Sequence, residues 1–155
     1  MTFRIEGLSP APFVDLYGLD DQELGRRGAV RYLVDKRPGF PDRIELRDAA
    51  PGETVLLVNH VSQPAETPYR ASHAIFVREG ATKPFDEVGV VPEVFRPRLL
   101  SLRAFDAAGM MVDADVVDGT EVEGLILRLL DDPRVSYVHA HNAKRGCYAA
   151  RISRA

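Results

Sequence analysis

The 155-residue sequence contains one cysteine, three lysines and no tryptophan. A single cysteine cannot form a disulfide within the chain, and the N-terminal residues lack the basic and long apolar regions of a secretion signal. The longest apolar runs are interrupted by charge or proline and are too short to span a bilayer. We therefore expect a protein of a bacterial-type cytoplasm with no membrane partner.

Phosphate-binding glycine motifs are also missing. The sequence has no Gly-x-Gly-x-x-Gly pattern and no Walker loop, so it carries no nucleotide motif. Its net charge of −3 gives no reason to expect nucleic acid, whose phosphates require a basic surface. The length and the 45% hydrophobic content are those of an ordinary globular protein, and we expect one domain over residues 1–155.

The hydrophobic pattern favours strands over helices. One helix is clear, at about 120–131, because an apolar stripe lies between a capping box of Thr120 and Glu123 and a terminating Pro133. Residues 80–97 are irregular, with at most a short helix near Pro92, and residues 12–28 favour short helical turns. Alternating or apolar runs predict strands at 3–9, 29–36, 43–49, 53–62, 73–79, on both sides of 106–109, at 135–143 and at 147–153.

The order of these elements predicts an α+β fold. Most of the strands follow one another in hairpin order, which favours a largely antiparallel sheet. The last two strands, separated by a Lys-Arg-Gly turn, form a final β-hairpin. In the first of them Tyr137, His139 and His141 share one face, because side chains alternate across a strand.

Two histidines on one strand face are the start of a metal site. His139 and His141 suit a divalent ion such as zinc or iron if a further ligand comes from elsewhere, and the candidates are His73, His60, Cys147 and nearby carboxylates. The same pattern is also common on ordinary half-exposed strands. The sequence leaves both interpretations open.

Cys147 is a second candidate for chemistry. An imidazole across the hairpin or the nearby Arg145 could activate its thiol as a nucleophile. A lone cysteine between a glycine and a tyrosine is more often a small buried apolar side chain.

A third hypothesis joins the hairpin to the segment "TPYRASHAIFV". Arginine and asparagine suit a carboxylate or another small anion, and a tyrosine could form an aromatic wall. The alternative is that Tyr69 and Arg70 only fix the loop by bonding backbone carbonyl groups. The residues proposed to bind the ligand are Tyr69, Arg70, His73, His139, His141, Asn142 and Arg145.

Two stretches carry a family resemblance. They contain "GETVLL", then "PYR" ahead of "IFV", and finally "HAHNAKRGCY". On these motifs the chain resembles the bacterial family called domain of unknown function 1203 over almost its whole length. The resemblance implies no activity, substrate or cofactor. It implies only that the following residues belong to the family pattern: Tyr69, Arg70, His141, Asn142, Gly146 and Cys147.

Three functions remain open from the sequence. The leading hypothesis is the binding of a small polar or anionic ligand by the Tyr/Arg/His/Asn cluster. The second is an enzyme that uses the same cluster, through a divalent metal on His139 and His141 or through Cys147 as nucleophile. The third is a structural role in which an exposed strand pairs with a second copy to form a homodimer.

Overall fold

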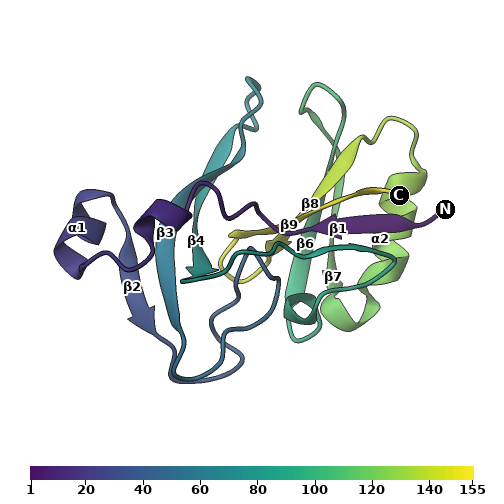
Figure 1. Cartoon of the computed structure of the whole chain (residues 1–155). Coiled ribbons are helices and arrows are strands. Elements are labelled where there is room, and N and C mark those ends of the chain that lie inside the picture. Colours follow the sequence, from purple (N-terminus) through teal and green to yellow (C-terminus); the bar gives the residue numbers. More distant parts are fainter.

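Two antiparallel sheets form the protein, whose computed structural model describes residues 1–155 (Figure 1). The larger sheet has the strand order β5-β1-β9-β8-β6-β7, and the smaller has the order β2-β3-β4. Every pair is antiparallel, so the predicted α+β fold is confirmed. The strands are β1 Phe3–Glu6, β2 Val30–Leu33, β3 Thr54–Gln63, β4 Ala71–Arg78, β5 Asp86–Val88, β6 Leu99–Phe105, β7 Met111–Asp118, β8 Tyr137–Asn142 and β9 Tyr148–Arg154.

The helices are few and short. They are α1 Asp21–Arg26, α2 Val122–Asp131 and the 3-10 helices Val14–Leu16, Glu93–Phe95 and Gly119–Glu121. These positions confirm the predicted helix at about 120–131, the short turns within 12–28 and the short helix near Pro92. No helix has the length and apolar character needed to cross a membrane.

Helix α2 covers one face of the larger sheet (Figure 1). Its predicted stripe is buried, because the spacing of its apolar residues keeps them on one side of the helix. Burying each such side chain contributes about 2 kcal/mol to folding. The stripe consists of Val122, Leu125, Ile126 and Leu129, and it packs with Leu100, Leu102, Val138, Ala140 and Ile152 of the sheet.

The predicted capping box is wrong. Asp118, rather than Thr120, caps the 3-10 helix that leads into α2, because its carboxylate accepts hydrogen bonds from the backbone N–H and the hydroxyl of Thr120. Glu123 does not reach back to a cap. Its carboxylate pairs with Arg96, 2.5 Å away, because the 3-10 turn before α2 leaves Glu123 on the side that faces this arginine.

The predicted strand at 43–49 is also wrong. Only a single bridge between Pro41 and Asp48 forms there. The carboxylate of Asp42 accepts the backbone N–H groups of Glu45 and Arg78, and such bonds compete with a strand ladder. Buried residues do alternate in this segment, but they enter two different clusters. Ile44 packs in the core beside the small sheet, and Leu46 packs in the core under α2.

Strand β5 lies in the segment predicted to be irregular. It has three exposed residues, Asp86–Val88, and pairs with β1 at the edge of the larger sheet. An ion pair between Arg4 and Asp86 accompanies this pairing. An exposed strand so short has no hydrophobic alternation to mark it, so nothing in the sequence indicated it.

The second face of the larger sheet lies toward the small sheet, and β8 shows the predicted alternation. Val138 and Ala140 lie in the core under α2, while the rings of Tyr137, His139 and His141 lie on the other side and contact one another in sequence. The small sheet contacts this face, since the Gln63 amide of β3 donates to the Tyr137 hydroxyl at 2.9 Å. The two sheets thus meet through polar and aromatic side chains.

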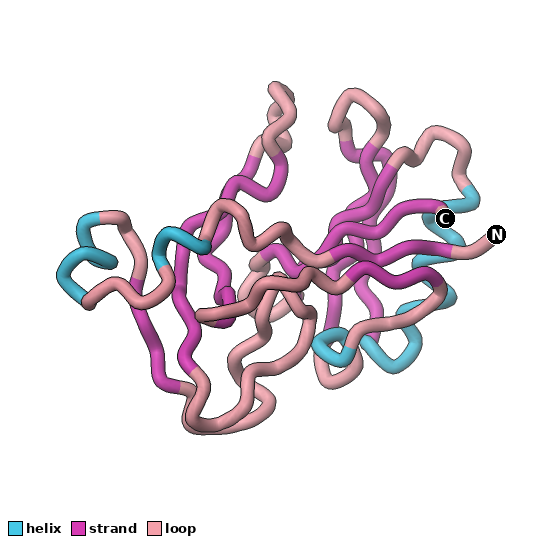
Figure 2. The backbone as a smooth tube through the Cα atoms, viewed as in Figure 1, coloured by secondary structure: helices cyan, strands magenta, loops and turns pink.

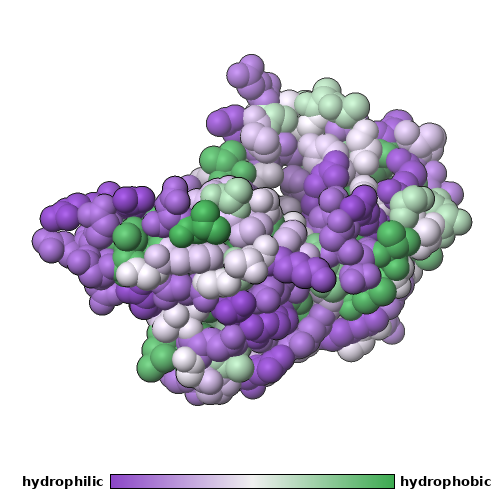
Figure 3. All heavy atoms as spheres, in the orientation of Figure 1, coloured by the Kyte–Doolittle hydropathy of each residue, from purple (hydrophilic) through white to green (hydrophobic).

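A long loop, residues 34–53, connects β2 to β3 and lies near the gap between the two sheets (Figure 2). The loop is tied to the larger sheet by an ion pair of 2.6 Å between Asp48 and Arg98. The visible surface is mostly hydrophilic, and its apolar residues form small separate groups (Figure 3).

Candidate functional site

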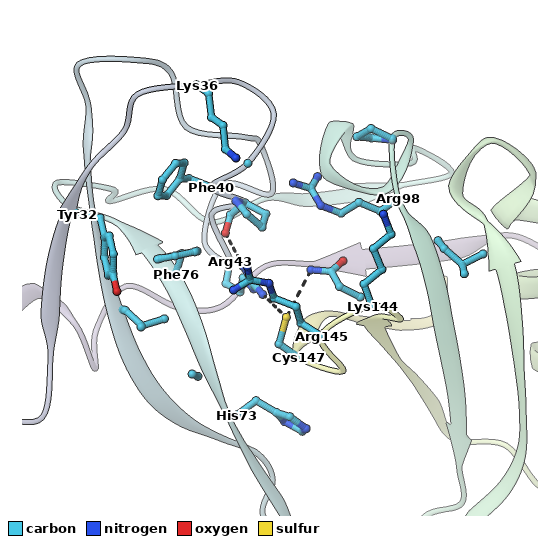
Figure 4. Close-up of a pocket in the computed structure, with 17 residues that line it drawn as sticks. Tyr32, Lys36, Phe40, Arg43, His73, Phe76, Arg98, Lys144, Arg145 and Cys147 are labelled. Atoms are coloured by element: carbon cyan, nitrogen blue, oxygen red, sulfur yellow. Dashed lines mark hydrogen bonds between the residues drawn. The ribbon is translucent and has the colours of Figure 1, made fainter.

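A pocket of about 670 Å³ opens between the two sheets and the loop 34–53 (Figure 4). This volume is within the usual range for small-molecule sites. The lining residues come from five separate parts of the chain. They are Tyr32, Lys36, Gly39, Phe40, Pro41, Arg43, Leu57, His73, Ala74, Phe76, Pro97, Arg98, Leu99, Asn142, Lys144, Arg145 and Cys147.

The lining is cationic and contains no aspartate or glutamate. Arg98 is neutralised by Asp48, but the other four cations have no carboxylate partner. In a protein with a net charge of −3, most arginines outside the pocket are paired with a carboxylate. The unpaired cations of the pocket, which we call the cationic wall, are Lys36, Arg43, Lys144 and Arg145.

Arg43 is the most deeply placed of these, with only 2% of its surface exposed. Its Nε donates to the carbonyl oxygen of Tyr148 at 2.9 Å, and its Nη1 donates to that of Pro41 at 2.6 Å. Its Nη2 donates to the Sγ of Cys147 at 3.0 Å. Burial lowers the pKa of Arg43, because the guanidinium loses its hydration without gaining a carboxylate.

Three aromatic rings lie on the side of the pocket that faces Lys144 and Arg145, and Lys36 lies beside them (Figure 4). Phe40 comes from the loop, Tyr32 from β2 and Phe76 from β4. The ring centroids of Phe40 and Phe76 lie 5.3 Å apart, and those of Tyr32 and Phe76 lie 5.6 Å apart with their edges turned to faces. These distances are typical of favourable aromatic pairs. We call this set the aromatic wall.

The turn between β8 and β9 supplies the polar side of the pocket. Gly146 has a φ of +74°, a conformation that favours glycine, and this turn sets Lys144 and Arg145 ahead of Cys147. The Cys147 Sγ accepts from Arg43 and more weakly from the Asn142 amide, at 3.7 Å. The thiol therefore lies in the pocket wall, half-buried and in contact with a guanidinium.

All four histidines gather beside this pocket, at the contact between the sheets. His73 of β4 lies 5.0 Å from His141 between ring centroids, and His60 lies 6.0 Å from Tyr148. Tyr148 also contacts His139, at 5.1 Å. Burial lowers the pKa of His139 to about 4 and that of His141 to about 3. These imidazoles are neutral at pH 7.

Residues 39–154 match the family model described as "Protein of unknown function (DUF1203)". The chain belongs to this family. The match covers the loop that carries Arg43, both walls except Tyr32 and Lys36, and the final hairpin. No curated protein and no solved structure matches the chain. The description of DUF1203 names no activity.

The histidines of this DUF1203 chain pack together without the set of ligands that a metal ion needs. The predicted ligands His73, His139 and His141 do come together, but no group of three or more histidine, cysteine or acidic side chains is placed to hold a metal ion. The Nδ1 of His141 instead bonds the carbonyl oxygen of Gly146 at 2.9 Å. The Nδ1 of His139 is buried without a partner. The rings pack against one another as aromatic groups.

The structure divides the residues that the sequence proposed for ligand binding. His73, Asn142 and Arg145 line the pocket, and His139 and His141 lie beside it. Tyr69 and Arg70 are not in the lining. Arg70 donates to the carbonyl oxygen of Pro64 at 2.5 Å, and Tyr69 packs its ring against Phe105. Arg70 thus bonds a backbone carbonyl group of the β3–β4 loop, as the alternative interpretation supposed, whereas Tyr69 makes a ring contact instead.

The sequence indicated Arg145 but not the aromatic wall or the other three residues of the cationic wall. Lys36, Phe40 and Arg43 lie in the loop between two strands, where no motif marks them, and Tyr32 and Phe76 looked like ordinary strand residues. One signal was present: the chain has only three lysines, and two of them, Lys36 and Lys144, line this pocket.

Proposed function

We propose that this protein binds a small anionic ligand in the pocket between its two sheets. The observation that carries the proposal is the cationic wall, which faces a pocket whose lining contains no carboxylate. Four cations without a carboxylate partner line the pocket, and an anion among them gains a favourable charge interaction. Guanidinium and ammonium groups are also the usual donors to carboxylate and phosphate.

The neighbourhood of the pocket strengthens this preference. Arg43 is held by backbone carbonyl groups and a thiol, so its guanidinium forms no ion pair with a carboxylate. The nearby histidines are neutral at pH 7 and supply no counter-charge. A ligand that brings one or two negative charges completes this set of donors.

Inorganic phosphate tests the anion site directly. Titration of ¹⁵N-labelled protein at pH 7 should shift the backbone signals of residues 142–147 together with the Nε–H signal of Arg43. Replacing both Lys144 and Arg145 with Glu should weaken the apparent affinity at least tenfold, which is about 1.4 kcal/mol. Each replacement removes a charge-assisted hydrogen bond or an attraction and adds a repulsion.

The third lysine provides the matched control. Lys83 is exposed, has no ion pair and lies outside the pocket, so Lys83→Glu changes the protein charge without touching the site. We expect this variant to bind phosphate as the original protein does. Lys144→Glu changes the net charge by the same amount. If Lys83→Glu weakens phosphate binding as much as Lys144→Glu does, the attraction is a property of net charge and the proposed site is wrong.

Catalysis in the same pocket is the second candidate, with Cys147 as nucleophile. The observation that favours it is the half-buried Sγ in a cationic pocket, and reactive cysteines are found in such partly exposed electropositive surroundings. Iodoacetamide should label Cys147 in the folded protein, and saturating phosphate should slow the labelling several-fold. Labelling that requires denaturation would instead make Cys147 a packing residue.

A further inference from the structure

The pocket presents two chemically different walls to whatever it holds. The aromatic wall belongs to the small sheet and the adjoining loop, and the cationic groups Lys144 and Arg145 belong to the final hairpin (Figure 4). We infer that the ligand is an aromatic anion, a planar ring that carries a carboxylate or phosphate group. This inference rests on the proposed anion site and adds the second half of the ligand.

The aromatic wall has a surface that a bare inorganic anion leaves uncovered. Tyr32 is 40% exposed on the edge strand β2, and the rings of Phe40 and Phe76 lie behind it without being fully buried. Apolar ring surface in a pocket gains free energy when another apolar surface covers it. A second planar ring does so with favourable offset or edge-to-face geometry.

The opposite wall sets the place of the charged group. Lys144 and Arg145 belong to one tight turn, and the Arg43 guanidinium lies between that turn and the aromatic wall (Figure 4). A guanidinium holds carboxylate or phosphate oxygens in its plane. A ligand with its charge at this turn has its other end directed toward Tyr32, Phe40 and Phe76.

The size of the pocket supports a two-part ligand. A volume of about 670 Å³ is much larger than a bare inorganic anion requires, and it suits a molecule with a ring system and an anionic group.

Matched pairs of small anions test this inference. Phenyl phosphate and methyl phosphate carry the same charged group, and benzoate and acetate form the carboxylate pair. Calorimetry and the shifts of residues 142–147 should show that at least one ring-bearing anion binds tenfold or more tightly than its methyl partner. The pair with the larger advantage identifies the charged group as phosphate or carboxylate.

Two variants of one residue show whether the rings carry the advantage. Tyr32→Ala should reduce the phenyl-to-methyl affinity ratio at least threefold. Tyr32→Leu keeps apolar volume without a ring, and it should also lose most of the ratio. Tyr69 is the control, because it is 39% exposed, nearly the same as Tyr32, but lies outside the pocket lining. Tyr69→Ala should leave the ratio unchanged, and a thermal midpoint near that of the original protein confirms that each variant is folded.

The outcomes separate this inference from the proposed function. If phenyl phosphate binds no more tightly than methyl phosphate at residues 142–147, and benzoate no more tightly than acetate, the anion site stands and the aromatic ligand is wrong. If Tyr32→Leu keeps the whole ratio, the wall recognises any apolar group and the requirement for a ring is wrong. If none of the four anions shifts residues 142–147, both proposals fail together.

Discussion

Lowering the pH from 7 to 5 should reduce the free energy of unfolding by about 4 kcal/mol. The effect comes from His139 and His141, which have 5% and 2% of their surface exposed. Burial lowers the pKa of His139 to about 4, with a smaller contribution from Arg151 and Arg103. Burial also lowers the pKa of His141 to about 3, although its bond to Gly146 opposes the shift.

Stability falls with pH because the folded and unfolded states bind different numbers of protons. In the unfolded chain both imidazoles take up a proton near pH 6.5, whereas in the folded protein they stay neutral to about pH 4 and 3. The unfolded state therefore binds more protons throughout the range from 6.5 down to 4. Each of these two histidines lowers the free energy of unfolding by about 2 kcal/mol between pH 7 and pH 5. His60 and His73, whose pKa values burial also lowers, act in the same direction.

Urea unfolding at pH 7, 6 and 5 measures this loss. Glu53 and Glu79, whose pKa values are held near 2 by arginine partners, lose their contribution only below about pH 4.5. Burial raises the pKa of Asp42, so its carboxyl group takes up a proton more readily in the folded protein and opposes the histidines. Proton NMR of the imidazole rings in the folded protein gives an independent check. A folded protein in which His139 and His141 titrate near 6.5 would falsify the explanation.

Local sequence patterns were sufficient for much of the fold. The helix α2 and the last two hairpins were predicted because their signals lie within the element itself: a stripe at helical spacing, or two alternating runs about a turn. The segment 43–49 also alternates, yet it is not a strand, because Ile44 and Leu46 enter different cores. Alternation shows which residues are buried and not what they pair with.

The candidate site depended on information that the sequence does not contain. The shared face of Tyr137, His139 and His141 could be derived from the strand period alone. The partner of that face could not, since the small sheet approaches it from residues some 70 positions earlier in the chain. Arg43 lies in a loop and reaches Tyr148 and Cys147 across the whole fold. Such contacts follow from how the two sheets pack, for which no local motif exists.

The contact between the sheets explains why the pocket stays electropositive. It contains four histidines and, nearby, Arg103, whose pKa burial also lowers. The imidazoles and Tyr148 fill this contact with rings that are neutral at pH 7. These neutral rings place no negative charge beside Arg43, so they do not offset the positive charge of the pocket.

Replacing Arg43 should have the second large effect, of about 3 kcal/mol in the free energy of unfolding for Arg43→Met. The change leaves the carbonyl oxygens of Pro41 and Tyr148 without their donor, and each unsatisfied buried acceptor costs about 1–3 kcal/mol. We expect Arg43→Lys to be no more stable than Arg43→Met. A lysine ammonium cannot reproduce the fork that serves three acceptors in three directions, and it still buries a charge.

Urea unfolding at pH 7 ranks the variants, and Arg70→Met is the matched control. Arg70 also bonds a carbonyl oxygen and has no carboxylate partner, but it is exposed, so its loss should change stability by less than about 0.5 kcal/mol. Folded Arg43→Met should no longer bind phosphate at residues 142–147. If Arg43→Lys is as stable as the original protein, the guanidinium fork is not required. If Arg43→Met still binds phosphate with full affinity, this charge does not belong to the anion site, and only Lys36, Lys144 and Arg145 can hold the ligand.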